Sequence, residues 1–331
     1  MNTADVLIVG GGIAGLSAAL FAKRAGRDVT VVDEGVHRAS DLPIALVNPL
    51  RGHSGRLVAR GVAGMHATFA LIDVLRDAGH AIAAGQGLFR PLIGVGAAAS
   101  QHAYWTERIA GRLAFDWHDR APATLGLVDD VPALHLRDAG WVAAPRLLAA
   151  LRSESDADVM IDRVIRLVPD ERGGGTAHLA DGSTVVARTI LWCGGAWGAS
   201  LLDESTSSDA SYKPGSLLVV DAQVSHEPLS FGLYVVPSNG DATLIGPTRE
   251  GSSVTFPESP VPDEAIAHLA ARIARVFVMT GPVRPAWRGV RLTRLSAAAT
   301  DALSGIATLT ALGSRGFLMA PLLAAEWARS L

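Results

Sequence analysis

Runs of branched apolar residues alternate with glycine turns and helical patterns from the start of the chain. Val6–Val9 is a continuous apolar run, which is typical of a strand buried in a parallel sheet. GGGIAG follows it directly and leads into LSAALFAKRAG, a helical pattern that Gly26 ends. A second apolar strand, Val29–Val32, stops at Asp33. The pattern therefore predicts strand, glycine turn, helix and strand within about 33 residues, the beginning of an α/β fold.

The later pattern predicts further helices and a strand-rich region. Helical spacing occurs at 57–78, 141–151 and 263–278, and apolar strands are predicted at 158–168, 184–192 and over most of 211–283. Pro145 fits the first turn of the middle helix. The strand at 184–192 runs into Cys193-Gly-Gly, which again brings a strand end to a glycine turn. We therefore expect two interleaved domains, with the nucleotide domain built from the start, middle and end of the chain.

The glycines of GGGIAG have separate physical roles. Gly10 allows the tight turn, Gly12 lets a pyrophosphate approach the backbone amides of the helix, and Gly15 lets helix and strand pack closely. Asp33, 18 residues after Gly15, is placed to accept hydrogen bonds from an adenosine ribose. A glycine turn that served packing alone would not account for this acid or its spacing. The motif predicts a dinucleotide site but does not distinguish a flavin from a nicotinamide.

Composition and charge exclude several classes of protein. The 331 residues are 49% hydrophobic, enough for one large domain or two that share a core. The single cysteine, Cys193, excludes a disulfide framework, indicates a cytoplasmic protein and is expected to be buried. The histidines lack ligand spacing, so we predict no metal. The net charge of −3 does not favour a nucleic-acid surface, and the glycines within Val6–Ala22 argue against a membrane anchor.

Eight motifs occur in order along nearly the whole chain. They are GGGIAG, VTVVDEG, GWVAAPRLLAAL, TILWCGGAWG, GLYVVP, ATLIGPT, AWRGVR and LGSRGFLMAP. This set resembles the FAD-dependent D-amino acid oxidase superfamily, which includes glycine oxidase, sarcosine oxidase and the oxidoreductase half of a bifunctional tRNA wobble-uridine modification enzyme. The resemblance implies a Rossmann-like FAD-binding domain interleaved with an antiparallel-sheet substrate domain. It assigns 1–85, 138–205 and 285–331 to the first domain and 86–137 and 206–284 to the second.

The resemblance also implies a reaction and its cofactor. FAD is expected to be noncovalent, because no cysteine lies near the closing motif LGSRGFLMAP. The family reaction is hydride transfer to flavin N5 from the carbon beside an amine, which leaves an imine that water hydrolyses. We expect a small amino acid or secondary amine as substrate and O2 as the acceptor. The oligomeric state is left open.

Two alternatives remain beside this reading. The closing GSRG followed by Ala-Pro also resembles the RNA-modifying oxidoreductase, which acts on a carboxymethylaminomethyl wobble uridine. The slight acidity of the chain and the lack of a preceding methyltransferase segment favour the small-molecule oxidase. The other alternative is a flavin-binding protein without oxidase activity.

The resemblance assigns the candidate site residues. Arg291 in AWRGVR is expected to grip the substrate carboxylate through two parallel hydrogen bonds, and Tyr234 in GLYVVP to lie on the substrate side. Arg315 is expected to reach substrate or flavin, and Arg51 and His53 to contact either. The structural alternatives are a salt bridge for Arg291, a packed ring for Tyr234 and an exposed helix cap for Arg315.

The remaining candidates are cofactor-binding residues. The turn at 313–317 precedes a helix and presents backbone amides to the negative charge of a reduced flavin. Trp287 is expected to lie in the core. The predicted cofactor-binding set is Gly10, Gly12, Ile13, Ala14, Gly15, Asp33, Glu34, Ser40, Gly194, Gly195, Trp197, Gly313, Ser314, Arg315, Gly316 and Phe317.

Overall fold

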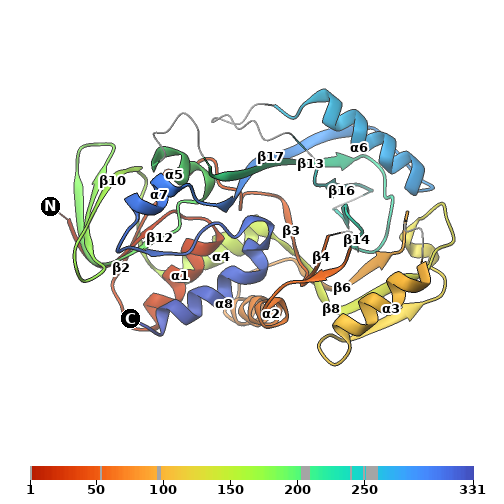
Figure 1. Ribbon diagram of the computed structural model, residues 1–331, viewed down its shortest axis with the longest axis horizontal. Helices are drawn as coiled ribbons and strands as arrows, with labels where there is room; N and C mark the ends of the chain where they lie inside the picture. Colours follow the sequence, from red (N-terminus) through yellow and green to blue (C-terminus); the bar gives the residue numbers. More distant parts are fainter. Residues whose placement is uncertain are drawn as a thin grey trace.

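Two β-sheets lie side by side, and the chain passes between them several times (Figure 1). The structure is a computed structural model, and it describes residues 2–52, 54–94, 98–202, 209–238, 241–248, 250 and 260–331. Both sheets draw strands from distant parts of the sequence, so neither forms from one continuous segment. The predicted α/β fold with interleaved parts is confirmed.

The first sheet has the strand order β10-β11-β12-β1-β2-β9, and β18 also pairs with β12. Its strands are β1 (Asn2–Val9), β2 (Val29–Val32), β9 (Asp158–Met160), β10 (Val164–Pro169), β11 (Gly175–Leu179), β12 (Thr184–Trp192) and β18 (Ala307–Thr308). β12, β1, β2 and β9 run parallel, and the apolar residues of β1 are buried between two layers of side chains. Because these strands are parallel, their carboxyl ends meet at one edge of the sheet.

The second sheet has the order β17-β13-β16-β15-β14-β6-β8-β3, and β7 pairs with β8. Its strands are β3 (Ile44–Val47), β6 (Ala84–Pro91), β7 (Phe115–His118), β8 (Ala133–Ala143), β13 (Ser211–Val220), β14 (Leu229–Ser230), β15 (Tyr234–Pro237), β16 (Thr243–Gly246) and β17 (Val283–Arg294). Its pairs are antiparallel except β14 with β6. Two short strands, β4 (Leu50–Arg51) and β5 (Arg56–Leu57), form a separate ribbon.

Helices pack against both sheets and complete the core. The helices are α1 (Ile13–Arg24), α2 (Gly61–Asp77), α3 (Ala98–Ile109), α4 (Ala144–Ser155), α5 (Gly195–Leu202), α6 (Asp263–Val276), α7 (Ala297–Ala302) and α8 (Gly316–Ala328), with 3-10 turns η1 (Ala123–Leu125) and η2 (Gly313–Arg315). α1 packs against α4 and α8, and α8 against α2 (Figure 1). Leu16, Met65 and Leu147 are buried in the largest apolar cluster, which joins these helices. In this cluster, α8 at the end of the chain packs against α1 at its beginning.

Two predicted boundaries need correction. The segment 141–143, predicted as helix, is the end of β8, because Trp141 pairs with Leu46 of β3 and the helix begins at Ala144. The strand predicted at 158–168 is two strands, β9 and β10, which pair with different partners. β3 and β17 join the second sheet although most of their residues fall in ranges assigned to the FAD-binding domain. The division into domains by residue range stays a prediction.

Candidate functional site

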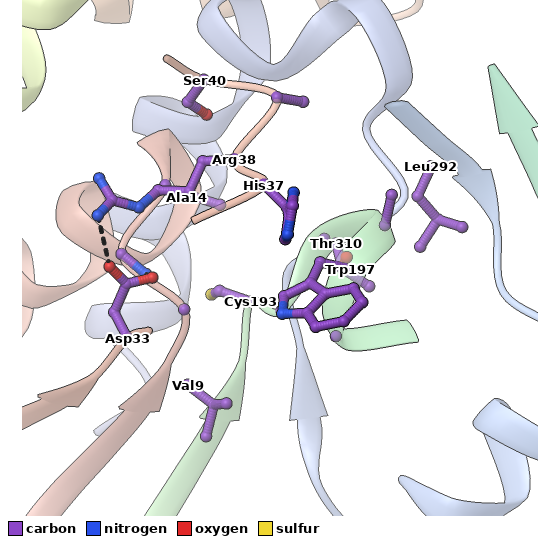
Figure 2. Close-up of a pocket in the computed structure, with 18 of the residues that line it drawn as sticks. Val9, Ala14, Asp33, His37, Arg38, Ser40, Cys193, Trp197, Leu292 and Thr310 are labelled. Carbon is purple, nitrogen blue, oxygen red and sulfur yellow. Dashed lines mark hydrogen bonds and ion pairs between the residues drawn. The ribbon is translucent and has the colours of Figure 1, made fainter. Parts of the chain in front are cut away.

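A groove of about 150 Å³ lies where β1, β2 and β12 end (Figure 2). Gly10 follows β1, Asp33 follows β2 and Cys193 follows β12. Most of the predicted cofactor residues line this groove: Gly10, Gly12, Ile13, Ala14, Asp33, Glu34, Ser40, Gly194, Gly195, Trp197, Gly313 and Gly316. Cys193 is buried as predicted, and burial raises the pKa of its thiol.

The glycines of the first turn meet different neighbours. Gly10 has φ +104°, and a Cβ there would lie 2.7 Å from the Cys193 carbonyl oxygen. A Cβ on Gly15 would lie 1.8 Å from the Gly10 carbonyl oxygen, so helix and turn pack too closely for a side chain. Gly12 has an ordinary φ of −78°, and its nearest neighbour would be Ser40 Oγ at 3.2 Å. The fold of the protein itself requires glycine at Gly10 and Gly15. A side chain at Gly12 would not clash with the backbone, but it would occupy space in the groove.

Two acids of the groove, Asp33 and Glu34, form ion pairs with basic side chains that the sequence patterns do not indicate. Asp33 Oδ1 accepts from the Gly11 amide at 2.9 Å, and Oδ2 lies 2.8 Å from Arg38 Nη2, as the dashed line in Figure 2 shows. Glu34 Oε2 accepts from Trp197 Nε1 at 2.8 Å, and its Oε1 lies 3.7 Å from Arg163 Nη1. Both carboxylates therefore have fixed orientations. The sequence indicates Arg38 only as a basic residue in the loop after β2, and this does not predict that it pairs with Asp33.

The groove has the chemistry that a dinucleotide requires. Gly12, the N-cap residue of α1, has no side chain to cap the helix, and the first turn has no acidic residue, so this helix end presents positive charge toward the groove. Ser40 Oγ accepts from the Ile13 amide at 3.1 Å, which holds the loop after β2 against this helix end. Thr310 Oγ1 also lines the groove and is buried without a hydrogen-bond partner in the described part of the chain. These features fit a phosphate-bearing ligand with polar groups.

A second cavity of about 290 Å³ adjoins the groove. The two share Ile13, Ala39, Ser40, Arg291, Gly313 and Gly316. The predicted residues Arg51, Tyr234, Arg291, Ser314 and Phe317 line the second cavity, so the fold brings together motifs from both sheets and from the closing turn.

Two predicted residues are not placed in this cavity. Arg315 is exposed, lines neither cavity and donates from Nε to the Leu312 carbonyl at 3.2 Å. His53 lies outside the described residues.

Alternation along β17 decides which side chains reach the second cavity. Trp287 and Arg291 line it, and Gly289 between them leaves room for the indole, because a Cβ there would lie 2.2 Å from the Trp287 ring. Val290 and Leu292 line only the groove, whereas Arg291 lines both spaces. Trp287 is therefore a half-buried cavity wall, and its expected place in the core is wrong.

The two arginines of AWRGVR have different surroundings. Arg288 Nε lies 2.8 Å from Glu250 Oε2. Burial raises the pKa of Glu250, but hydrogen bonds from Ser216, Thr248 and Arg288 outweigh it, so its pKa lies below the usual range. Arg291 makes a 3.4 Å contact from Nε to the Lys213 carbonyl, and no carboxylate among the described residues forms an ion pair with it. Arg291 is thus the arginine of this motif that an anionic ligand can reach.

Tyr234 begins β15 and lies on the same cavity as Arg291. Burial raises the pKa of its hydroxyl, and the positive charge of Arg291 offsets only part of that rise. The phenol is therefore neutral at physiological pH and keeps its proton to donate. Its position on the cavity supports the predicted substrate side for this residue.

A buried arginine supports the loop that carries Arg51. Arg90, on β6, is 1% exposed and donates to the Leu50 carbonyl at 2.8 Å and the Gly52 carbonyl at 2.6 Å. Its guanidinium lies 4.8 Å from the centre of the Trp105 ring, and burial lowers its pKa to about 10. The two carbonyls flank Arg51, so Arg90 fixes the backbone from which Arg51 reaches the cavity. No local pattern predicts this role, because β6 and β4 are adjacent only in the folded chain.

Replacement of Arg90 by methionine is expected to leave FAD bound but to raise the substrate KM about tenfold, because the loop with Arg51 loses two charge-assisted hydrogen bonds. Steady-state kinetics with a separate fit of kcat and KM measures this. Arg76→Met is the matched control, since Arg76 also donates to two carbonyls, of Ile82 and Ala84, away from both cavities. An equal change of KM in both variants contradicts a positioning role for Arg90.

The described residues also limit other kinds of site. Their helices include none with the length and apolarity needed to cross a membrane. Across the same residues, no group of three or more histidine, cysteine, aspartate or glutamate side chains is placed to hold a metal ion.

A dinucleotide groove at the edge of a parallel sheet, opening into a cavity on an antiparallel sheet, defines a two-sheet oxidoreductase that depends on a dinucleotide. The chain belongs to the FAD dependent oxidoreductase family, whose sequence profile matches residues 5–330. The class and the family both agree with the resemblance noted in the motifs.

Curated relatives and solved structures share this architecture. The chain is 31% identical over 336 residues to the tRNA 5-methylaminomethyl-2-thiouridine biosynthesis bifunctional protein MnmC of Caulobacter vibrioides, covering 96% of this chain and 52% of the relative. It is 28% identical over 377 residues to the protein of the same name from Delftia acidovorans, covering 95% of this chain and 56% of the relative. The chain spans about half the length of these curated relatives.

Among solved structures, glycine oxidase from Bacillus cereus superposes with a TM-score of 0.79 at 20% identity, covering 99% of this chain and 94% of that one. Iminodiacetate oxidase from Chelativorans sp. gives 0.78 at 20% identity, covering 98% and 94%. These similarities establish the fold.

Proposed function

We propose that the protein oxidises the C–N bond of a small amine that carries a carboxylate, with noncovalently bound FAD and O2 as the electron acceptor. One observation carries the proposal: Arg291 lines a cavity next to the dinucleotide groove and has no carboxylate partner among the described residues. A guanidinium in this setting is suited to bind a substrate carboxylate through two parallel hydrogen bonds.

FAD would be held by the groove and the closing turn. Gly12, the first turn of α1 and Ser40 suit the pyrophosphate, Asp33 suits the ribose, and 313–317 suits the ring end. When bound, FAD supplies a two-electron acceptor for the oxidation. The fit rests on the space at Gly12 and on the unpaired Thr310 hydroxyl of the groove.

The cavity residues would orient the substrate and would not act as bases. Arg291 fixes the carboxylate, and the neutral Tyr234 hydroxyl can donate to the same group or to the amine. Among the described residues that line this cavity there is no aspartate, glutamate or histidine. The amine is therefore expected to enter in its neutral form, so that no protein carboxylate is needed to remove its proton.

The overall reaction balances for an N-substituted glycine. The amine R–NH–CH2–COO⁻ loses two electrons and two protons and becomes the imine R–N=CH–COO⁻. Water adds to the imine carbon and the C–N bond breaks, which gives R–NH2 and glyoxylate. O2 takes up the two electrons and two protons as H2O2.

The test is an anaerobic titration of the purified yellow protein with glycine, sarcosine and D-amino acids. We expect at least one of these amines to bleach the visible flavin absorption, and peroxide to form when air is readmitted. FAD that stays oxidised with every amine while it remains bound contradicts the proposal. That result would instead support a flavin-binding protein without oxidase activity.

A second candidate function is supported by the curated relatives, whose names refer to tRNA 5-methylaminomethyl-2-thiouridine biosynthesis and which align with at least 95% of this chain. A carboxymethylaminomethyl uridine contains the same N-carboxymethyl amine as the small substrates. An RNA-modifying enzyme should bind tRNA with a strong dependence on salt and should be reduced by tRNA that carries this group. Reduction by small amines alone, with no binding of tRNA, excludes this candidate.

A further inference from the structure

The second cavity contains two guanidiniums that come from different elements. Arg51 extends from β4 and Arg291 from β17, and both side chains line the cavity and are partly buried. Burial lowers the pKa of both groups, and the positive charges of Arg315 and Arg291 lower that of Arg51 further. Two like charges therefore share one partly desolvated space.

Neither charge is balanced by an acid of the described chain. Arg51 Nη2 donates to the neutral Ser314 hydroxyl, and Arg291 contacts the Lys213 carbonyl. Arg90, behind the Arg51 loop, adds a third positive charge with only carbonyl, hydroxyl and ring partners. The negative charge of Glu250 offsets part of the lowering of the Arg291 pKa, but the carboxylate itself is bound by Arg288, Ser216 and Thr248.

Two other half-buried arginines near the cavities are paired with acids. Arg38 lies 2.8 Å from Asp33, and Arg288 lies 2.8 Å from Glu250. The described part of the fold thus supplies acids to Arg38 and Arg288 and supplies none to Arg51 and Arg291. Unpaired charges in a desolvated cavity are costly unless a ligand of opposite sign completes the site.

We propose that the substrate carries two anionic carboxylates, one bound by Arg291 and the other by Arg51. Its chemical class is a dicarboxylic secondary amine, in which a carboxylate lies on each side of the nitrogen. The oxidation of this amine rests on the proposed function, whereas the recognition of two carboxylates does not. If both arginines instead grip one carboxylate, their loss affects monocarboxylates and dicarboxylates alike.

Thioether analogues test recognition without turnover, because sulfur replaces the amine nitrogen. Thiodiacetate has two carboxylates and methylthioacetate has one. We expect the FAD-loaded protein to bind thiodiacetate about 50-fold more tightly, measured by perturbation of the flavin spectrum, because a second charge-assisted pair forms. Arg51→Met should reduce this preference to less than about fivefold, because it weakens the binding of thiodiacetate far more than that of methylthioacetate.

Arg56→Met is the matched control. Arg56 lies opposite Arg51 in the β4–β5 ribbon, is exposed and lines neither cavity, so its removal takes away one nearby positive charge without touching the site. In Arg56→Met, the preference for thiodiacetate over methylthioacetate should stay within about twofold of that of the parent protein, as expected for a screened surface charge.

The outcomes separate this inference from the proposed function. Equal binding of both thioethers, or an equal loss of both in Arg51→Met, overturns the dicarboxylate inference. Tight, Arg51-dependent binding of thiodiacetate with no bleaching by any amine, iminodiacetate included, keeps the inference and rejects the proposed reaction. Bleaching by sarcosine and iminodiacetate with equal kcat/KM keeps the reaction and rejects the inference.

Discussion

Replacement of Arg291 by methionine is expected to lower kcat/KM for the carboxylate-bearing amine about 10³-fold, because a partly buried carboxylate loses its charge-assisted partner. The flavin spectrum should stay unchanged, since the first groove keeps its glycine turn and acids. Arg291→Lys should recover part of the loss, because an ammonium keeps the charge but cannot make two parallel hydrogen bonds. Stopped-flow reduction of the bound flavin measures the effect separately from reoxidation.

Arg294 provides the control for Arg291 on the same strand. It is exposed and donates to the Asp209 carbonyl at 2.6 Å, outside both cavities. Arg294→Met should therefore keep kcat/KM within about twofold, because exposed arginines contribute little. Unchanged reduction kinetics in Arg291→Met would show that Arg291 does not anchor the substrate.

Replacement of Gly12 by alanine is expected to weaken FAD binding at least about 100-fold while the apoprotein stays folded, because the added methyl group fills space that the backbone leaves for the pyrophosphate. The φ of Gly12 suits alanine, and its nearest neighbour, Ser40 Oγ at 3.2 Å, needs to shift only slightly. The FAD content of the purified protein and the Kd for reconstitution measure the loss. The free energy of unfolding of the apoprotein should change by less than about 1 kcal/mol.

Two other glycines distinguish blocked binding from a damaged fold. Gly15→Ala places Cβ 1.8 Å from the Gly10 carbonyl oxygen, so it should destabilise the apoprotein itself. Gly182, in the turn between β11 and β12, has φ +86° and open space around its Cβ position, so Gly182→Ala should cost about 1 kcal/mol and leave FAD binding intact. Full FAD retention in Gly12→Ala would refute the role assigned to this glycine.

The predictions that held depend on short-range signals. The order of strand, glycine turn, helix and strand between Val6 and Asp33 is a local pattern, and each of its parts forms where its residues predict. The sequence predicts a helix at the end of β8, because the apolar spacing of Trp141–Ala143 also suits a helix, and only pairing with β3 makes this segment a strand. Periodicity cannot separate these two cases in a segment of this length.

The composition of the second cavity depends on long-range contacts. Arg291 and Arg288 stand three positions apart in one motif, yet Glu250 neutralises Arg288, and the strand alternation of β17 places Arg291 on the cavity. Arg90 supports Arg51 only because β6 lies next to the β4–β5 ribbon.

The sequence alone determined the dinucleotide turn, the α/β class and the motifs that supply candidate arginines, because hydrophobic period, glycine spacing and charge are local properties of a chain. The tertiary structure decided which arginines are paired and which share a cavity. Ion pairs and burial arise between segments that are distant in sequence, so Arg51 and Arg291 become one site only when β4 and β17 come together.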